Sequence, residues 1–341
     1  MDDGLHEKPL QPPQSSTGDF DLYSLLLWEK TMFRKINYVT LLLAVFLAAC
    51  GGSAVATDIP VAENPSTLVL TDGLGREVKL DSPAQRVVSL APSNTEILFA
   101  IGAGSQVVGR DELSDYPEEA KAVESVGGSM GDFSTEAIVA LEPDLVLASE
   151  LNTPELVKTL EDLGLKVYYL PNPKSFEALY ENLATVGQLT GHDVTELVDS
   201  LEARVTAVDE KIAPISFRPT VFYELDGTDP LKPWTSGPGT FVDLLIARAG
   251  GFNVGSTVQG EWAQISSEEL VAANPSIILL GDALYGVTVE SVAARTGWDS
   301  IAAVENNAIY PFNPDLATRP GPRLVEALEE MAKLLHPGLF P

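Results

Sequence analysis

Apolar and polar positions follow one short pattern twice along the chain, at a spacing of 132 residues. The stretch F-S-T-E-A-I-V-A-L-E-P-D-L-V-L-A over Phe133–Ala148 returns as I-S-S-E-E-L-V-A-A-N-P-S-I-I-L-L over Ile265–Leu280. In each copy a serine, Ser134 or Ser266, precedes the apolar positions of a short helix, where its hydroxyl can accept a free backbone N–H as an N-cap. A proline then ends the helix, and the apolar run after it predicts a buried strand of a parallel sheet. The pattern predicts two similar α/β lobes, because solenoid repeats are much shorter.

Further apolar runs surround the first copy. A Gly-rich turn between residues 68–70 and 77–80 predicts a hairpin. Ser93 or Asn94 is suited to begin a helix that ends at Gly102. Strands are expected at residues 86–90, 106–109 and 166–170, and a helix at residues 154–163.

Two helices follow the first lobe. The first begins after Ser175 and ends at Gly191. The residues Asp193–Glu196 have the pattern of a capping box and predict the start of a second helix, which stops at Pro214. At 1.5 Å per residue the second helix is about 30 Å long. A long amphipathic helix in this place can serve as a stiff strut between two lobes.

The second lobe repeats the scheme around the second copy. Strands are expected at residues 220–225 and 308–312, and helices at residues 240–249, 289–295 and 324–335. Pro322 is expected in the N1 position of the last helix. The Gly/Pro-bearing residues 226–239, 250–262 and 313–323 are expected to form loops, which places Trp234 and Trp262 in loops.

The N-terminal part of the chain differs from the rest. Residues 1–31 show no convincing element and indicate an over-long start, with Met32 the true initiator. After Met32 come a basic segment, an apolar run, small residues and Cys50, the only cysteine of the chain. This order resembles the lipobox of bacterial lipoproteins, which implies that Cys50 is lipidated and becomes the mature N-terminus. The apolar run is well short of the roughly 20 residues that a membrane-spanning helix needs.

The predicted fold class is α/β, with two Rossmann-like lobes of mainly parallel sheets bridged by one long α-helix. The expected domains, in chain order, are a disordered over-long start (1–31), a lipoprotein signal peptide (32–49), a tether (50–67), an N-terminal lobe (68–192), a bridging helix (193–213) and a C-terminal lobe (214–341).

The net charge of the chain argues against two kinds of partner. The 341 residues carry a formal net charge of −28. Nucleic acids and anionic membrane surfaces attract basic patches, so binding to either is not expected.

Several motifs resemble one family. R-V-V-S-L-A-P-S-N-T-E-I-L-F-A-I-G-A-G, D-Y-P and T-E-A-I-V-A-L-E-P-D-L-V-L-A are similar to motifs of the iron-chelate and cobalamin receptors of bacterial ABC importers, most of all the cobalamin-binding ones. The resemblance runs from about Leu68 to the C-terminus. It implies an extracytoplasmic, membrane-anchored lipoprotein that captures a corrinoid between its lobes and delivers it to a two-fold ABC permease with its ATPase. Haem or a ferric siderophore is the alternative ligand. No cofactor of the protein's own is implied, because such a ligand brings its own chelated cobalt or iron.

The resemblance also implies ligand-contacting residues. Trp234 and Trp262 match aromatic ligand contacts of the cobalamin receptors, although a loop tryptophan more often serves local packing. In the first lobe the matching positions are Leu113 and the region of Ser129 and Met130, where those receptors carry aromatic residues and this chain does not.

Polar and axial contacts are implied as well. Asp315 and Arg319 match polar ligand contacts of the family, against the plainer role of a solvated loop. A haem ligand would need an axial Tyr or His, for which Tyr116 and Tyr285 are candidates.

Two glutamates of the repeated pattern match residues with which the family docks onto its permease. Glu136 and Glu268 occupy equivalent positions in the first turns of the two short helices. A carboxylate there also favours the helix dipole, which is the structural alternative.

Two other kinds of site are disfavoured. Gly127–Gly131 spells G-x-S-x-G, which in α/β-hydrolases places a nucleophile such as Ser129 directly between a strand and a helix. Here a loop follows the motif, so a hydrolase is the weaker alternative and an enzyme is not expected. A bare zinc or manganese ion needs converging histidines and carboxylates, whereas the three histidines are scattered over positions 6, 192 and 336.

Overall fold

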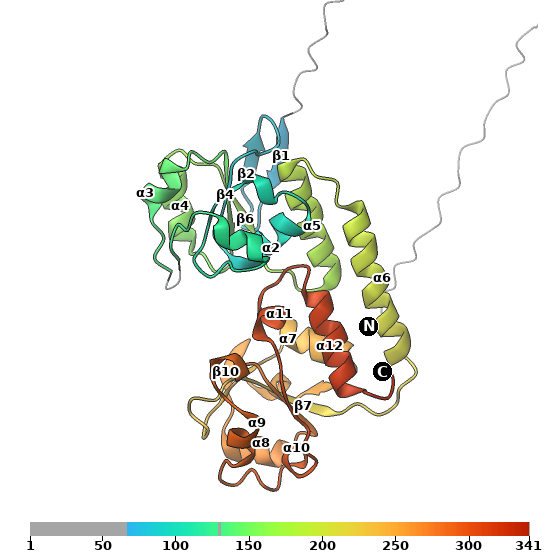
Figure 1. Ribbon diagram of the computed structural model, residues 1–341. Coiled ribbons are helices and arrows are strands. Elements are labelled where there is room, and N and C mark those ends of the chain that lie inside the picture. Colours follow the sequence, from blue (N-terminus) through green and yellow to red (C-terminus); the bar gives the residue numbers. More distant parts are fainter. Residues whose placement is uncertain (1–66, 129–130, 341) are drawn as a thin grey trace, which may run out of the picture. The chain divides into compact units, whose positions relative to one another are not determined.

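A computed structural model describes residues 67–340 apart from 129–130. All of these residues belong to one compact unit of the chain. Within it a hairpin of β1 (Leu68–Thr71) and β2 (Glu77–Leu80) precedes two α/β lobes, as expected (Figure 1). The signal peptide, Cys50, Ser129 and Met130 lie outside the described residues.

The first lobe is built on a parallel sheet with the strand order β4-β3-β5-β6. Its elements are β3 (Val87–Ser89), α2 (Pro92–Ala100), β4 (Val107–Arg110), α3 (Thr135–Ala140), β5 (Leu145–Ser149), α4 (Pro154–Asp162), β6 (Val167–Leu170) and α5 (Phe176–Thr190), with short 3-10 helices at Gly104–Gln106 and Glu118–Ala122.

Alternate residues of the central strand β5 serve the two faces of this sheet. Leu145 and Leu147 are buried in one apolar cluster with residues of α2 and α5. Val146 and Ala148 are buried in another cluster with residues of α3 and α4. A parallel strand covered on both faces has to be apolar throughout, which is why its sequence is a continuous apolar run.

The second lobe carries a mixed sheet with the order β10-β8-β7-β11-β12, and β9 also pairs with β7. The elements are β7 (Thr220–Asp226), β8 (Trp234–Ser236), α7 (Phe241–Arg248), β9 (Phe252–Asn253), β10 (Trp262–Gln264), α8 (Ser267–Ala273), β11 (Ile277–Leu280), α9 (Val289–Ala293), α10 (Ala302–Glu305), β12 (Ile309–Pro311), α11 (Pro314–Thr318) and α12 (Leu324–Leu335), with 3-10 helices at Val254–Thr257 and Ala283–Tyr285. The strands β7, β11 and β12 are parallel, whereas β8 and β10 form an antiparallel edge.

The helix α6 (Thr195–Ile212) connects the lobes (Figure 1). Its 18 residues make it about 27 Å long, close to the expected length. Its buried residues Leu201, Val205 and Val208 belong to an apolar cluster that runs through both lobes and includes residues of α5, α7 and α12. The bridging element is therefore a packed strut that shares its core with both lobes.

Three predicted helix starts are wrong. The helix α2 begins at Pro92 with Ala91 as its N-cap, because the fixed φ of proline suits the first helical position. Ser93 and Asn94 are buried inside the helix instead. The last helix has Arg323 as its N-cap, so Pro322 precedes the helix and is not its first residue.

The third wrong start is the capping box at Asp193. The N-cap of α6 is Val194, which has no side-chain cap. The Asp193 carboxylate instead accepts from the N–H and the hydroxyl of Thr195, at 3.0 and 2.7 Å. A local two-residue turn has replaced the reciprocal capping bonds.

Candidate functional site

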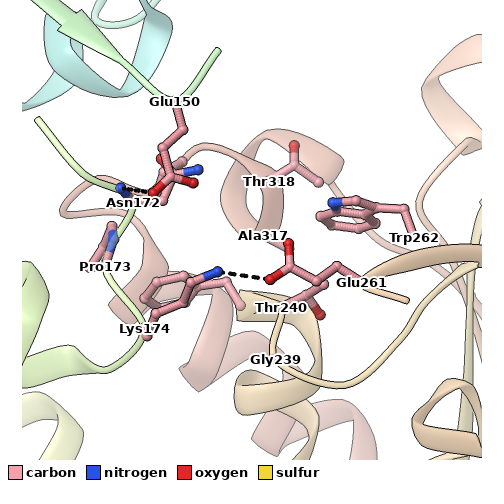
Figure 2. A pocket seen from close by; sticks show the side chains of 12 residues that line it. Glu150, Asn172, Pro173, Lys174, Gly239, Thr240, Glu261, Trp262, Ala317 and Thr318 are labelled. Carbon is pink, nitrogen blue, oxygen red and sulfur yellow. Dashed lines mark hydrogen bonds and ion pairs between the residues drawn. The ribbon is translucent and has the colours of Figure 1, made fainter. Parts of the chain in front are cut away.

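A cavity lies between the two lobes at the carboxyl ends of several strands. It encloses about 80 Å³. The first lobe contributes residues that follow β5 and β6, and the second lobe contributes residues around β10, α7 and α11 (Figure 2). The lining residues used below are Glu150, Asn172, Lys174, Thr240, Glu261, Trp262 and Thr318. Open α/β sheets place ligand sites at the carboxyl ends of their strands, so this cavity is the candidate functional site.

Two large aromatic side chains, Phe241 and Trp262, line this cavity, and Trp262 is 44% exposed. It begins the edge strand β10, which pairs with β8 so that Trp262 lies opposite Ser236 and Gln264 opposite Trp234. Residues opposite each other in an antiparallel pair point to the same face, so Trp234 and Trp262 share one face of this ribbon. The prediction that both tryptophans lie in loops is wrong, because each belongs to a strand of three residues. The Gly and Pro residues that flank these short strands favoured the loop prediction. Trp234 is not part of the cavity wall.

Two polar contacts fix the rim of the cavity. Lys174 Nζ lies 3.0 Å from Glu261 Oε1 and so joins the first lobe to the second (Figure 2). Glu150 Oε1 accepts from the backbone N–H of Asn172 at 3.1 Å. The lining thus carries two carboxylates and one ammonium group, and the ammonium group is already paired.

Arg319 and Asp315 lie together, in a second contact between the lobes. The Arg319 guanidinium contacts Asp115 of the first lobe at 2.6 Å and Asp315 at 3.0 Å, and it is 3.7 Å from Glu96. Burial alone would raise the pKa of Asp115, but the hydrogen bond and charge of Arg319 hold it below its ordinary value. The neighbours Ala317, Thr318 and Pro320 line the cavity, so Arg319 lies at its border and not in its wall.

Arg323 strengthens this junction. Its Nε and Nη2 contact both oxygens of Glu96, at 2.8 and 2.5 Å, and its guanidinium lies 3.8 Å from the ring centre of Tyr116. Glu96 is only 3% exposed, and burial is the main cause that raises its pKa. Tyr116 is half exposed and lines another cavity of about 440 Å³ together with Glu96, Pro322 and Arg323. The structure therefore places Tyr116 and Trp262 on different cavities.

The remaining predicted residues lie as follows. Leu113 is exposed in the loop after β4, and no cavity described above includes it. Glu136 and Glu268 are exposed in the second position of α3 and of α8, one on each lobe, as the repeat predicts. Tyr285 is 81% exposed at the end of a 3-10 helix in the second lobe.

Sequence reasoning missed Glu150 and Lys174. Glu150 directly follows β5, and Asn172–Lys174 follow β6. The sequence predicted both strands. Because ligand sites lie at the carboxyl ends of parallel strands, the positions directly after β5 and β6 could have been predicted as candidates.

No group of three or more His, Cys, Asp or Glu residues suited to a metal ion exists within 67–128 and 131–340. In the same part of the chain, no helix has the length and apolar character needed to cross a bilayer.

The chain has two α/β lobes joined by a long helix, with a cavity between them at the ends of strands. This arrangement defines the class of two-lobed, helix-bridged substrate-binding proteins. Residues 87–316 match the family model described as "Periplasmic binding protein". The chain belongs to this family of substrate-binding transport proteins.

Relatives agree with this membership. The chain is 34% identical over 309 residues to an uncharacterized ABC transporter substrate-binding lipoprotein, YvrC, of Bacillus subtilis, covering 88% of this chain and 96% of that protein. It is 30% identical over 275 residues to a cobalamin-binding protein of Halobacterium salinarum, covering 78% and 73%.

Solved structures agree as well. The periplasmic vitamin B12-binding protein BtuF of Vibrio cholerae aligns with a TM-score of 0.63 at 26% identity, covering 74% of this chain and 97% of that one. The periplasmic heme-binding protein RhuT of Roseiflexus in its apo form aligns with a TM-score of 0.66 at 28% identity, covering 75% and 99%.

Proposed function

We propose that this protein captures a corrinoid in the cavity between its lobes and delivers it to an ABC permease. The observation that carries the choice of ligand is the chemistry of the cavity lining. Trp262 offers an aromatic surface, and besides the paired Lys174 the lining carries hydroxyl, amide and carboxylate groups, such as those of Thr318, Asn172 and Glu150. The periphery of a corrinoid bears primary amides, and these donate to and accept from such groups.

Haem and anionic ferric siderophores suit this lining less well. The propionates of haem are held best by free cations. Among the described residues that line the cavity, Lys174 is the one cation, and it is paired with Glu261. Haem also needs an axial ligand, yet Tyr116 lies under Arg323 on another cavity and Tyr285 is not part of this lining. We therefore place haem and siderophores second.

The protein needs no resident cofactor for this role, because a corrinoid carries its own cobalt and an iron chelate its own iron. Binding and release then depend on the lobes and on the side chains between them. The ligand requires more room than the cavity of about 80 Å³ offers, since pockets for drug-sized ligands enclose roughly 300–1,000 Å³. The lobes must therefore move apart when it enters.

Delivery would use one contact from each lobe. Glu136 and Glu268 are exposed carboxylates in equivalent positions of α3 and α8. A two-fold permease presents the same surface twice, so a receptor with a repeated acidic contact can engage both of its subunits. An anchor at the lipidated Cys50 would keep the receptor at the outer face of the membrane that holds the permease.

The nature of the ligand can be tested directly. The purified protein is titrated with cyanocobalamin, cobinamide and haemin, followed by calorimetry and by absorbance, and any co-purifying molecule is weighed by mass spectrometry. We expect saturable binding of a corrinoid and no shift in the wavelength of the haemin absorbance band. Tight haemin binding without corrinoid binding would overturn the choice of ligand.

A further inference from the structure

The contact between Lys174 and Glu261 crosses the candidate cavity. Lys174 lies in the segment after β6 of the first lobe, and Glu261 directly precedes β10 of the second lobe. Figure 2 shows the two side chains reaching toward each other along the cavity wall. Both are well exposed, at 58% and 53% of the side chain.

Each end of this contact is fixed to its own lobe. The backbone oxygen of Glu261 accepts from Gly237 N at 2.7 Å. On the other side, Asn182 donates from Nδ2 to the Pro171 oxygen at 2.8 Å, and Asn172 N donates to Glu150. The separation of the two backbones therefore follows the separation of the lobes.

The second junction between the lobes is of a different kind. Glu96 is buried, and Arg323 contacts both of its carboxylate oxygens. Breaking a buried ion pair leaves an uncompensated charge and is strongly destabilising, whereas an exposed pair contributes little. When the lobes separate, the Lys174–Glu261 contact is therefore the one that opens first.

We infer that the Lys174–Glu261 pair is a latch, which the ligand displaces on entry, so that these two residues lower its affinity. The Glu96–Arg323 pair stays closed and keeps the lobes joined on its side. The inference rests on the proposed function to the extent that the ligand enters this cavity.

Affinity measurements give the first test. Lys174→Ala and Glu261→Ala should each raise the affinity for the bound corrinoid by about two- to five-fold, since the ligand no longer competes with an exposed ion pair. The exchange Lys174→Glu with Glu261→Lys should return the affinity to that of the wild type. Higher ionic strength should raise the affinity of the wild type and leave that of Lys174→Ala unchanged.

A matched control comes from α4. Lys158 forms an exposed pair with Asp162, and neither residue lines the cavity. Lys158→Ala should leave the affinity and its salt dependence unchanged. Unchanged or weaker binding by both Lys174→Ala and Glu261→Ala would overturn the latch.

A ligand-free measurement separates the latch from the proposed function. Spin labels are attached at Glu155→Cys and Asp299→Cys, two exposed positions on different lobes, in the chain with Cys50→Ser. We expect Lys174→Ala to widen the distribution of distances between the two labels, measured by pulsed electron paramagnetic resonance. The double variant Lys174→Glu with Glu261→Lys should restore the distribution of the wild type. A wider distribution in a protein that binds no corrinoid would refute the proposed function and keep the latch. An unchanged distribution would refute the latch even if the affinity changes.

Discussion

Glu142 and Asn274 have the same positive φ of 46°, each just after the end of its short helix, α3 or α8. They lie at equivalent positions of the two copies of the repeated pattern. A residue other than glycine is strained in this left-handed region, and asparagine tolerates it better than most. Asn274 also uses its side chain, because its Oδ1 accepts from Ala302 N at 2.8 Å. The repeat therefore extends to the backbone, while the two side chains have different roles.

This difference predicts different changes in stability when each residue is replaced by glycine. Glu142→Gly should raise the free energy of unfolding by about 0.5–1 kcal/mol, because the strain is relieved and the carbonyl that accepts from Arg86 is retained. Asn274→Gly should give no gain, because the bond to Ala302 is lost. Urea unfolding followed by circular dichroism measures both changes. A destabilised Glu142→Gly variant would show that the glutamate side chain has a role of its own.

Local sequence patterns predicted the elements that local chemistry determines. Ser134 and Ser266 are N-caps whose hydroxyls accept from Ala137 and Glu269, both at 3.1 Å, which confirms the prediction from the repeat. Gly191 ends α5 with a φ of 78°, also as predicted. In each case the partner is within a few residues, so the pattern contains the information.

Contacts between distant residues could not be predicted in this way. Glu96 and Arg323 are 227 positions apart, and Lys174 and Glu261 are 87 apart. Each of these residues alone has the sequence context of an ordinary exposed charge. Only the packing of the two lobes brings them together, so the part of the site that joins the lobes required the structure.

The hydrogen bonds of Asp72 predict how much this residue stabilises the fold and how that contribution depends on pH. Its Oδ1 accepts from Leu74 N and Arg76 N, both at 3.0 Å, and its Oδ2 accepts from Tyr169 N at 3.2 Å and from the Arg76 side chain. Asp72→Asn should lower the free energy of unfolding at neutral pH by about 1.5–3 kcal/mol, because these hydrogen bonds involve a charged acceptor. Thermal unfolding of both proteins measures the difference.

The difference should shrink in acid. Burial alone would raise the pKa of Asp72, but the hydrogen bonds and charge of Arg76 and the bond from Tyr169 hold this pKa below its ordinary value. An acid whose pKa is lowered by folding stabilises the protein above its unfolded pKa, and that contribution is lost as the pH falls through the folded pKa. The gap between wild type and Asp72→Asn should therefore narrow below about pH 4. A gap that widens in acid would contradict this account.

Cys50 tests the lipid anchor. Cys50→Ser removes the thiol to which a lipid would be attached, so the protein should leave the membrane fraction and be released in soluble form. Cell fractionation and mass spectrometry of the N-terminal peptide measure this outcome. An unlipidated N-terminus in the wild type would rule out the anchor.

Trp262 tests the cavity. Trp262→Ala removes a large aromatic surface from the cavity wall and should weaken ligand binding by about 1–3 kcal/mol. Trp234→Ala should have a smaller effect, because Trp234 does not line the cavity. Phe217→Ala serves as a control, since Phe217 is 72% exposed and is not among the cavity residues. Unchanged affinity together with a lower melting temperature in Trp262→Ala would make this tryptophan a packing residue.

Glu136 and Glu268 test delivery to the permease. Both follow the first residue of a helix, where a carboxylate also gains about 0.3–1 kcal/mol from the helix dipole. Glu155 has the same position in α4 and therefore controls for the dipole. The double variant Glu136→Ala with Glu268→Ala should bind ligand as the wild type does but fail to support uptake. The control Glu155→Ala should bind ligand and support uptake as the wild type does. Ligand binding is measured by calorimetry on the purified proteins, and uptake by labelled ligand in cells or proteoliposomes with the permease. Because neither glutamate lines the cavity, normal uptake by the double variant would leave both residues with only their interaction with the helix dipole, and loss of binding would place the ligand site elsewhere.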